Sequence, residues 1–142
     1  MSEFNGSSLR KPRFNTDGTM IAIDKLGQEI KVGDYIAYGH ALGRCAGLRI
    51  GKVLKVSYEK SNDWPREDIF KIKVWGIDDE WSYAPILCST PGTLNFPDRI
   101  VVLPLNQVPP DYVELIKDIT NETKIKDVRA TIPEYKDRIR RN

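Results

Sequence analysis

The chain has 142 residues, of which 40% are hydrophobic and 30% are charged, and its formal net charge is +2. This length and composition suit one globular domain, and no run approaches the roughly 18 apolar residues that a membrane span requires. Residues 1–14 lack the apolar core of a secretory signal. We therefore expect a cytoplasmic protein that has no membrane partner.

The charges are distributed unevenly along the chain. Residues 21–123 carry 12 basic and 15 acidic side chains, whereas residues 124–142 carry seven basic and three acidic ones. A protein that clamps duplex DNA without sequence preference normally carries its positive charge on the folded body. The distribution argues against that mode of binding and makes the basic C-terminal segment a candidate contact region.

Residues 1–17 are polar and predict a flexible leader. Between that leader and residue 106, short segments with alternating or continuous apolar residues predict strands. The expected strands are residues 20–23, 35–38, 48–58, 69–77, 81–87 and 99–103. Pro85 makes the fifth an edge strand, and three glycines predict a loop at residues 39–47.

Alternation within the two longest strands predicts which side chains face the core. The core-facing sets are Ile50, Leu54, Val56 and Tyr58 in the first and Phe70, Ile72 and Val74 in the second. Trp75 falls on the opposite face, together with Lys71 and Lys73. Because Trp75 shares its face with two lysines, we expect its ring to be exposed.

The pattern changes to a helical period after residue 107. Pro109 and Pro110 suit the first turn of a helix, and one apolar stripe follows at Tyr112, Leu115, Ile116 and Ile119. Capping-box spacing at Thr131 and Glu134 predicts a second helix. The expected organisation is a leader (1–17), a β domain (18–106) and a helical segment (107–142) that packs on the β domain or extends from it.

Side chains that suit catalysis or metal binding are few. His40 is the sole histidine, so any nucleophile–histidine pair has to use it. Cys45 and Cys88 lack the spacing and the further ligands of a zinc site. The acidic run at residues 78–80 suits a solvated turn better than a metal site. We therefore predict no enzymatic activity, no catalytic residue, no metal and no cofactor.

Three surfaces are candidate binding sites. The first is the glycine-rich loop at residues 39–49, with His40, Arg44 and Arg49, where arginines and backbone amides could hold an anion. The second combines lysine and aromatic side chains, namely Lys71, Lys73, Trp75 and Trp64, which suit an extended peptide or nucleic-acid bases. The third is the basic tail, with Lys136, Arg138, Arg140 and Arg141.

The stretch from Val32-Gly33-Asp34 to Gly51-Lys52-Val53-Leu54 resembles the opening strands of SH3-like small barrels, including KOW-type modules. Together with the expected strands, this resemblance implies a mainly β fold: a small barrel of five or six antiparallel strands with one or two C-terminal helices. It also implies a binding module. The block from Asp24 to Val53 is similar to small accessory proteins of tailed bacteriophages, which implies the cytoplasm of an infected bacterium.

These surfaces lead to three hypotheses about function. The first, which we favour, is a phage accessory protein that docks on a host or phage protein through Trp75 and the loop at residues 39–49. The second is a nucleic-acid-binding protein that uses Lys71, Lys73, Trp75 and the basic tail. The third is a protein that holds a small anionic ligand, such as a nucleotide, with Arg44, Arg49 and loop amides. This ligand would be bound either by one chain or between subunits. The oligomeric state is left open.

Overall fold

The computed structural model describes residues 13–42, 45–60, 68–79 and 85–130. The strands are β1 (Tyr35–Leu42), β2 (Cys45–Lys60), β3 (Asp68–Asp78), β4 (Ile86–Leu87), β5 (Gly92–Leu94) and β6 (Ile100–Leu103), and the helices are α1 (Pro110–Ile116) and α2 (Ile125–Ala130). Two short 3-10 turns flank β6. The six strands form one antiparallel sheet, so the expected mainly β fold with C-terminal helices is confirmed.

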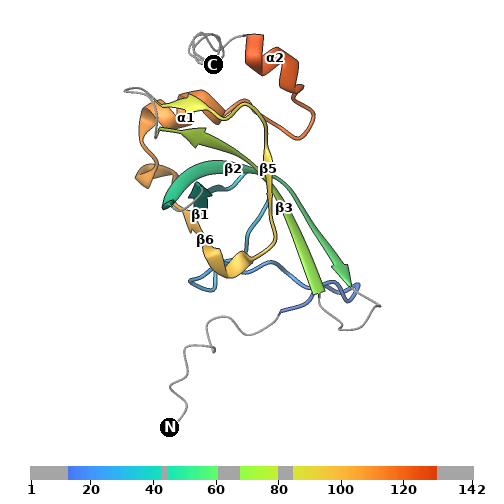
Figure 1. Ribbon diagram of the computed structural model, residues 1–142. Coiled ribbons are helices and arrows are strands. Elements are labelled where there is room, and N and C mark those ends of the chain that lie inside the picture. The colour runs from blue at the N-terminus through green and yellow to red at the C-terminus, as the bar shows by residue number, and fades with distance from the viewer. Residues whose placement is uncertain (1–12, 43–44, 61–67, 80–84, 131–142) are drawn as a thin grey trace.

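The sheet is built around the long β2–β3 hairpin (Figure 1). The strand order is β4–β3–β2–β1–β6, and β5 also pairs with β3. β4 and β5 use different stretches of β3, because β5 pairs with residues 72–74 and β4 pairs with residues 77–78. The two helices lie at one end of the sheet, and the N-terminal segment lies at the other (Figure 1).

One extra residue in β2 places two residues that are three positions apart, Val53 and Val56, on the same face of the sheet. β2 pairs with β3 in one register up to Val53 and in a register shifted by one residue from Lys55 onward, which constitutes a β-bulge. Val53 and Val56 face the first core, whereas Leu54 belongs to the second. The prediction that Leu54 shares a face with Val56 is therefore wrong, because strict alternation assumes that no residue is inserted.

The first core lies between the sheet and the N-terminal segment. Its buried residues are Ala22, Ile30, Ile36, Tyr38, Val53, Phe70, Ile72, Val74 and Ile100. Residues 20–23, which were expected to form a strand, instead make isolated bridges that pair Phe14 with Met20 and Ile23 with Glu29. Ala22 thus reaches the core from an irregular segment that crosses the sheet.

A buried carboxylate fixes this irregular segment to the sheet. Asp24 Oδ1 accepts hydrogen bonds from the backbone N–H groups of Leu26 (2.9 Å) and Gln28 (2.7 Å). Asp24 Oδ2 accepts from Gln28 Nε2 (2.9 Å) and from the backbone N–H of Val102 (2.7 Å). Because Val102 belongs to β6, one side chain both shapes the turn at residues 24–28 and ties that turn to a strand.

The second core covers the opposite face of the sheet. Its buried residues are Leu54, Trp75, Ile77, Ile86, Leu87, Ile116, Ile119 and Val128. The predicted apolar stripe is confirmed, because Ile116 and Ile119 are buried while Tyr112 and Leu115 pack at the edge of this core. The Lys52 ammonium also reaches the C-terminal segment, where it donates to the Lys117 carbonyl oxygen at 2.7 Å.

Several element boundaries differ from those expected. β1 extends to Leu42 and β2 begins at Cys45, so the predicted loop at residues 39–47 is wrong: most of it forms the end of a hairpin. β5 was not expected, because its three residues are too few to show a period. The sequence also missed α2, and the helix predicted from Thr131 lies outside the described residues.

Candidate functional site

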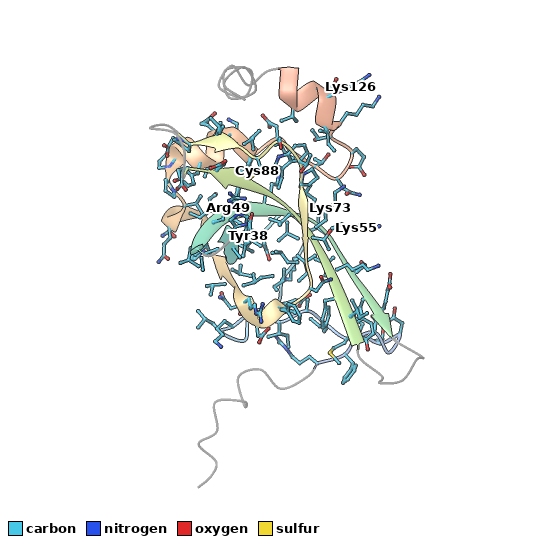
Figure 2. All side chains as sticks on the ribbon, viewed as in Figure 1. Tyr38, Arg49, Lys55, Lys73, Cys88 and Lys126 are labelled. Carbon is cyan, nitrogen blue, oxygen red and sulfur yellow. The ribbon has the colours of Figure 1, made fainter. Side chains whose placement is uncertain are left out.

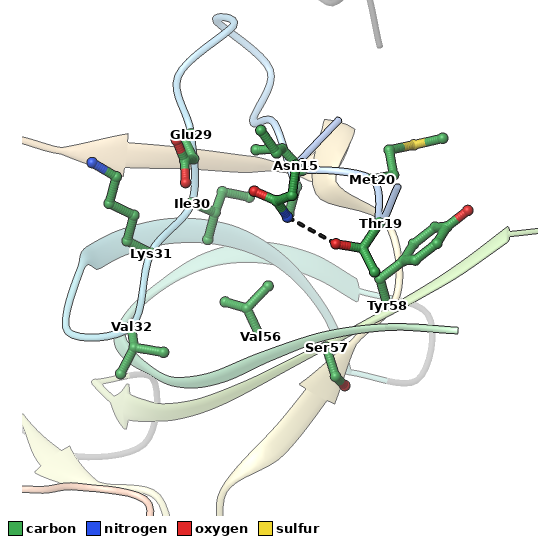
Figure 3. Close-up of a pocket in the computed structure, with 12 residues that line it drawn as sticks. Asn15, Thr19, Met20, Glu29, Ile30, Lys31, Val32, Val56, Ser57 and Tyr58 are labelled. Atoms are coloured by element: carbon green, nitrogen blue, oxygen red, sulfur yellow. Dashed lines mark hydrogen bonds between the residues drawn. The ribbon is translucent and has the colours of Figure 1, made fainter. Parts of the chain in front are cut away.

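A groove of about 440 Å³ lies between the N-terminal segment and the second half of β2 (Figure 3). Residues 19–22 and 29–32 form one wall, and residues 56–58 form the other. Its apolar lining includes Met20, Ile30, Val32, Val56 and Tyr58, and its polar lining comprises Asn15, Thr19, Glu29, Lys31 and Ser57. This mixture suits an extended peptide, whose side chains need apolar pockets and whose backbone needs polar partners.

The groove is open because the chain bends away from β2 at a tight turn. On this side of β2, Val53 accepts a hydrogen bond from the Gly33 N–H and donates one to the Asp34 carbonyl oxygen, both at 2.8 Å. Gly33 has a φ of +93°, which favours glycine, and the Asp34 carboxylate accepts from the Lys31 N–H at 2.8 Å. Beyond Val53, the described residues provide no strand partner for this edge of β2.

Lysine side chains gather on the outer face of the β2–β3 hairpin. Lys55 lies directly opposite Lys73 in the register of the two strands, and both are labelled in Figure 2. Lys73 Nζ donates to the neutral Oδ1 of Asn121 at 2.8 Å. Lys71 forms an exposed ion pair with Glu59 at 3.0 Å. Like charges directly opposite one another destabilise a sheet, and the described residues form no ion pair with Lys55 or Lys73.

Trp75 is buried, with 1% of its surface exposed, so the prediction of an exposed ring is wrong. The ring is on the face of β3 that alternation indicated, but the C-terminal segment covers that part of the face with Ile116, Ile119 and Val128. Its Nε1 donates a hydrogen bond to the Cys88 carbonyl oxygen at 2.8 Å. Trp75 therefore serves the second core and cannot stack on a ligand while that core is intact.

The end of the β1–β2 hairpin contains two other predicted site residues. Arg49 lies opposite Tyr38 and His40 lies opposite Gly47. A Cβ at Gly76 would overlap the Tyr38 hydroxyl and lie 3.2 Å from Arg49 Cδ, so this glycine lets both side chains pack against β3. His40 Nε2 is buried and has no hydrogen-bond partner among the described residues. The backbone here is extended and paired, unlike the loop expected to curl around an anion.

The remaining predicted site residues lie outside the described part of the chain. They are Arg44, Trp64, Lys136, Arg138, Arg140 and Arg141. Sequence reasoning also missed Lys55, Asn121 and the groove. Lys55 was not combined with Lys71 and Lys73 because the register of β2 against β3 is not encoded in either strand alone. The groove depends on contacts between segments that are distant in sequence.

The described residues contain no group of three or more His, Cys, Asp and Glu side chains that could hold a metal ion. Neither described helix has the length and apolar character needed to cross a bilayer.

A family model described as a domain of unknown function (DUF7205) matches residues 22–62. This span includes the Asp24 turn, β1, β2 and parts of both walls of the groove. No curated protein and no solved structure matches the chain. Residues 22–62 are therefore similar to a family to which no function is assigned.

Proposed function

We propose that the protein is a non-enzymatic binding module that docks on another protein, and that an extended segment of the partner occupies the groove between β2 and the N-terminal segment. The observation that carries this proposal is the combination of a groove with a mixed apolar and polar lining and an adjacent edge of β2 that has no described strand partner beyond Val53. A strand edge offers a row of backbone donors and acceptors that an extended peptide can use.

The groove favours a peptide over a compact ligand because its lining follows β2 for several residues. Val56 and Tyr58 are two positions apart on the same side of the strand and both line the groove. A peptide that pairs with β2 would direct alternate side chains into the groove beside Val56 and Tyr58. The exposed Val32, on the opposite wall, would contact the same side chains of the peptide.

The finer fold and the biological setting belong to this proposal as well. An SH3-like barrel fits a mainly antiparallel sheet whose β1–β2 hairpin follows the Gly33–Asp34 turn. A phage accessory role in the bacterial cytoplasm is supported by the sequence resemblance at residues 24–53.

A displayed library of random 12-residue peptides, selected on the wild-type protein, tests the docking site. Val32→Glu places a charge in the groove at a side chain that is 64% exposed, so folding should be retained. We expect this variant to bind the selected peptides at least tenfold more weakly than wild type does. Leu48→Glu, at a side chain that is 76% exposed on the β1–β2 hairpin, serves as the matched control and should change affinity less than twofold.

The opposite result, with binding lost in Leu48→Glu and kept in Val32→Glu, would move the docking site to the hairpin end that includes His40 and Arg49. Hydrogen exchange gives a second readout, because alternate residues of a strand direct their amides to the same neighbour. Peptide binding should slow exchange at alternate amides between residues 54 and 60. Unchanged exchange there would contradict strand pairing.

A further inference from the structure

We propose a second binding site, distinct from the groove: the outer face of the β2–β3 hairpin contacts the phosphodiester backbone of duplex nucleic acid through Lys55, Lys71 and Lys73. The face is defined by the register, which places Lys55 opposite Lys73 and Ser57 opposite Lys71. Tyr58 and Phe70, in the next pair, belong to the first core. The three lysines thus project from the side of the hairpin that faces away from that core.

Charge complementarity identifies the ligand. Side chains directly opposite in an antiparallel pair have Cβ atoms about 5 Å apart, so the Lys55 and Lys73 ammonium groups can contact neighbouring phosphates of the duplex backbone, one phosphate each. Lys73 is hydrogen-bonded to a neutral amide oxygen, which orients its ammonium group without cancelling the charge. Phosphates bound at both lysines would relieve a repulsion that the unliganded sheet has to tolerate.

The charges around the hairpin show where on this face positive charge is unpaired. Residues 21–123 carry more acidic than basic side chains overall. On the described part of this hairpin face, however, the acidic side chain is Glu59, and its charge is matched by the ion pair with Lys71. Beyond Asn121, exposed Lys124 and Lys126 are interspersed with the acidic Glu122 and Asp127. The Lys55–Lys73 pair is therefore the part of this face where positive charge has no described counterion.

On this face, the described residues between 55 and 73 include no accessible aromatic ring among the lysines, which favours the duplex backbone over unpaired bases as the ligand. Proteins that bind single strands without sequence preference stack bases on aromatic side chains. The ring expected to serve this purpose, Trp75, is buried in the second core, and the described part of this face offers lysines instead. Phosphate contacts of this kind carry no sequence information and weaken as salt is added.

Fluorescence anisotropy with a labelled 20-base-pair duplex, measured on the full chain between 50 and 200 mM salt, tests the proposal. Each neutralised phosphate contributes about −0.9 to the slope of log affinity against log salt. Three lysine contacts predict a roughly 40-fold loss of affinity over this range, whereas Lys55→Gln/Lys73→Gln should leave a roughly 3.5-fold loss. Lys55→Gln alone should reduce the slope by about 0.9.

The matched control is Lys25→Gln/Lys126→Gln, which removes the same charge from exposed lysines that lie outside both the groove and the Lys55–Lys73 pair and should keep the wild-type slope. Thermal melting of each variant verifies folding, and Lys55→Gln provides the readout if the double variant does not fold. The proposal is overturned by equal slopes in wild type and Lys55→Gln, by an equal loss in the control, or by no duplex binding at 50 mM salt. Tighter binding of the matching single strand, or a slope that falls only in Arg138→Gln/Arg140→Gln, also overturns it.

Discussion

The four hydrogen bonds accepted by Asp24 make this side chain the most sensitive polar position in the N-terminal segment. Its two oxygens accept from three backbone N–H groups and one side-chain amide at 2.7–2.9 Å. In Asp24→Asn one oxygen becomes an NH₂ group, and in either orientation of the amide two of the four contacts become donor against donor. Two lost hydrogen bonds and two unsatisfied donors, at about 1 kcal/mol each, predict a loss of about 2–4 kcal/mol in unfolding free energy.

Urea unfolding followed by circular dichroism measures this loss. With a denaturant slope of about 2 kcal/mol/M, a loss of about 3 kcal/mol lowers the midpoint by about 1.5 M, and the melting temperature should fall by about 10 °C. Asp98→Asn, at an exposed position, is the matched control and should stay within about 0.5 kcal/mol of wild type. If Asp24→Asn also stays within that range, the carboxylate does not hold the N-terminal segment against β6 and our reasoning is refuted.

Two further predictions concern the second core and its edge. Trp75→Phe should lower the unfolding free energy by about 1–2 kcal/mol, because the Cys88 carbonyl loses its indole donor. The salt slope of this variant for duplex binding should match that of wild type. A reduced slope would show that Trp75 contacts the ligand. Tyr112 donates a hydrogen bond to the Asp79 carboxylate, and this bond raises the pKa of Tyr112 to about 12. The folded-state pKa lies above the unfolded value of 10, so the bond stabilises the fold below pH 10 and its contribution disappears as the pH rises through 12. Tyr112→Phe should therefore cost about 1 kcal/mol at pH 7, after allowance for solvent screening, and the difference from wild type in urea melts should vanish near pH 12; a pH-independent difference would contradict the assignment.

Local patterns in the sequence predicted those parts of the fold that depend on neighbouring residues. Alternation located β2 and β3, a continuous apolar run located β6, and the helical period identified Ile116 and Ile119 as buried. The turn at Gly33–Asp34 was likewise predictable, because glycine, which adopts a positive φ without strain, and a short acidic side chain are typical turn residues. These features are encoded within a few residues of one another.

The features that sequence reasoning missed depend on contacts across the chain. Alternation placed Trp75 on the correct face of β3, yet its burial is decided by Val128 and other residues of the C-terminal segment. Val56 and Tyr58 pack against the first core as predicted, but the bulge at Leu54 puts Val53 in that core and Leu54 in the second one, and it brings Lys55 opposite Lys73. The groove similarly requires that residues 29–32 lie across from residues 56–58, which no local period can indicate.

Because the β2–β3 hairpin carries a hydrophobic core on each face, it limits how far the chain can be truncated. A chain ending at residue 107 would leave Leu54, Trp75 and Ile77 without the helical layer that shields them, and such an exposed apolar patch promotes aggregation. The segment matched by the family model, residues 22–62, contains β1 and β2 but none of β3. An isolated two-stranded unit is marginally stable at best in water, so residues 22–62 of this chain need β3 beside β2 to complete a stable sheet.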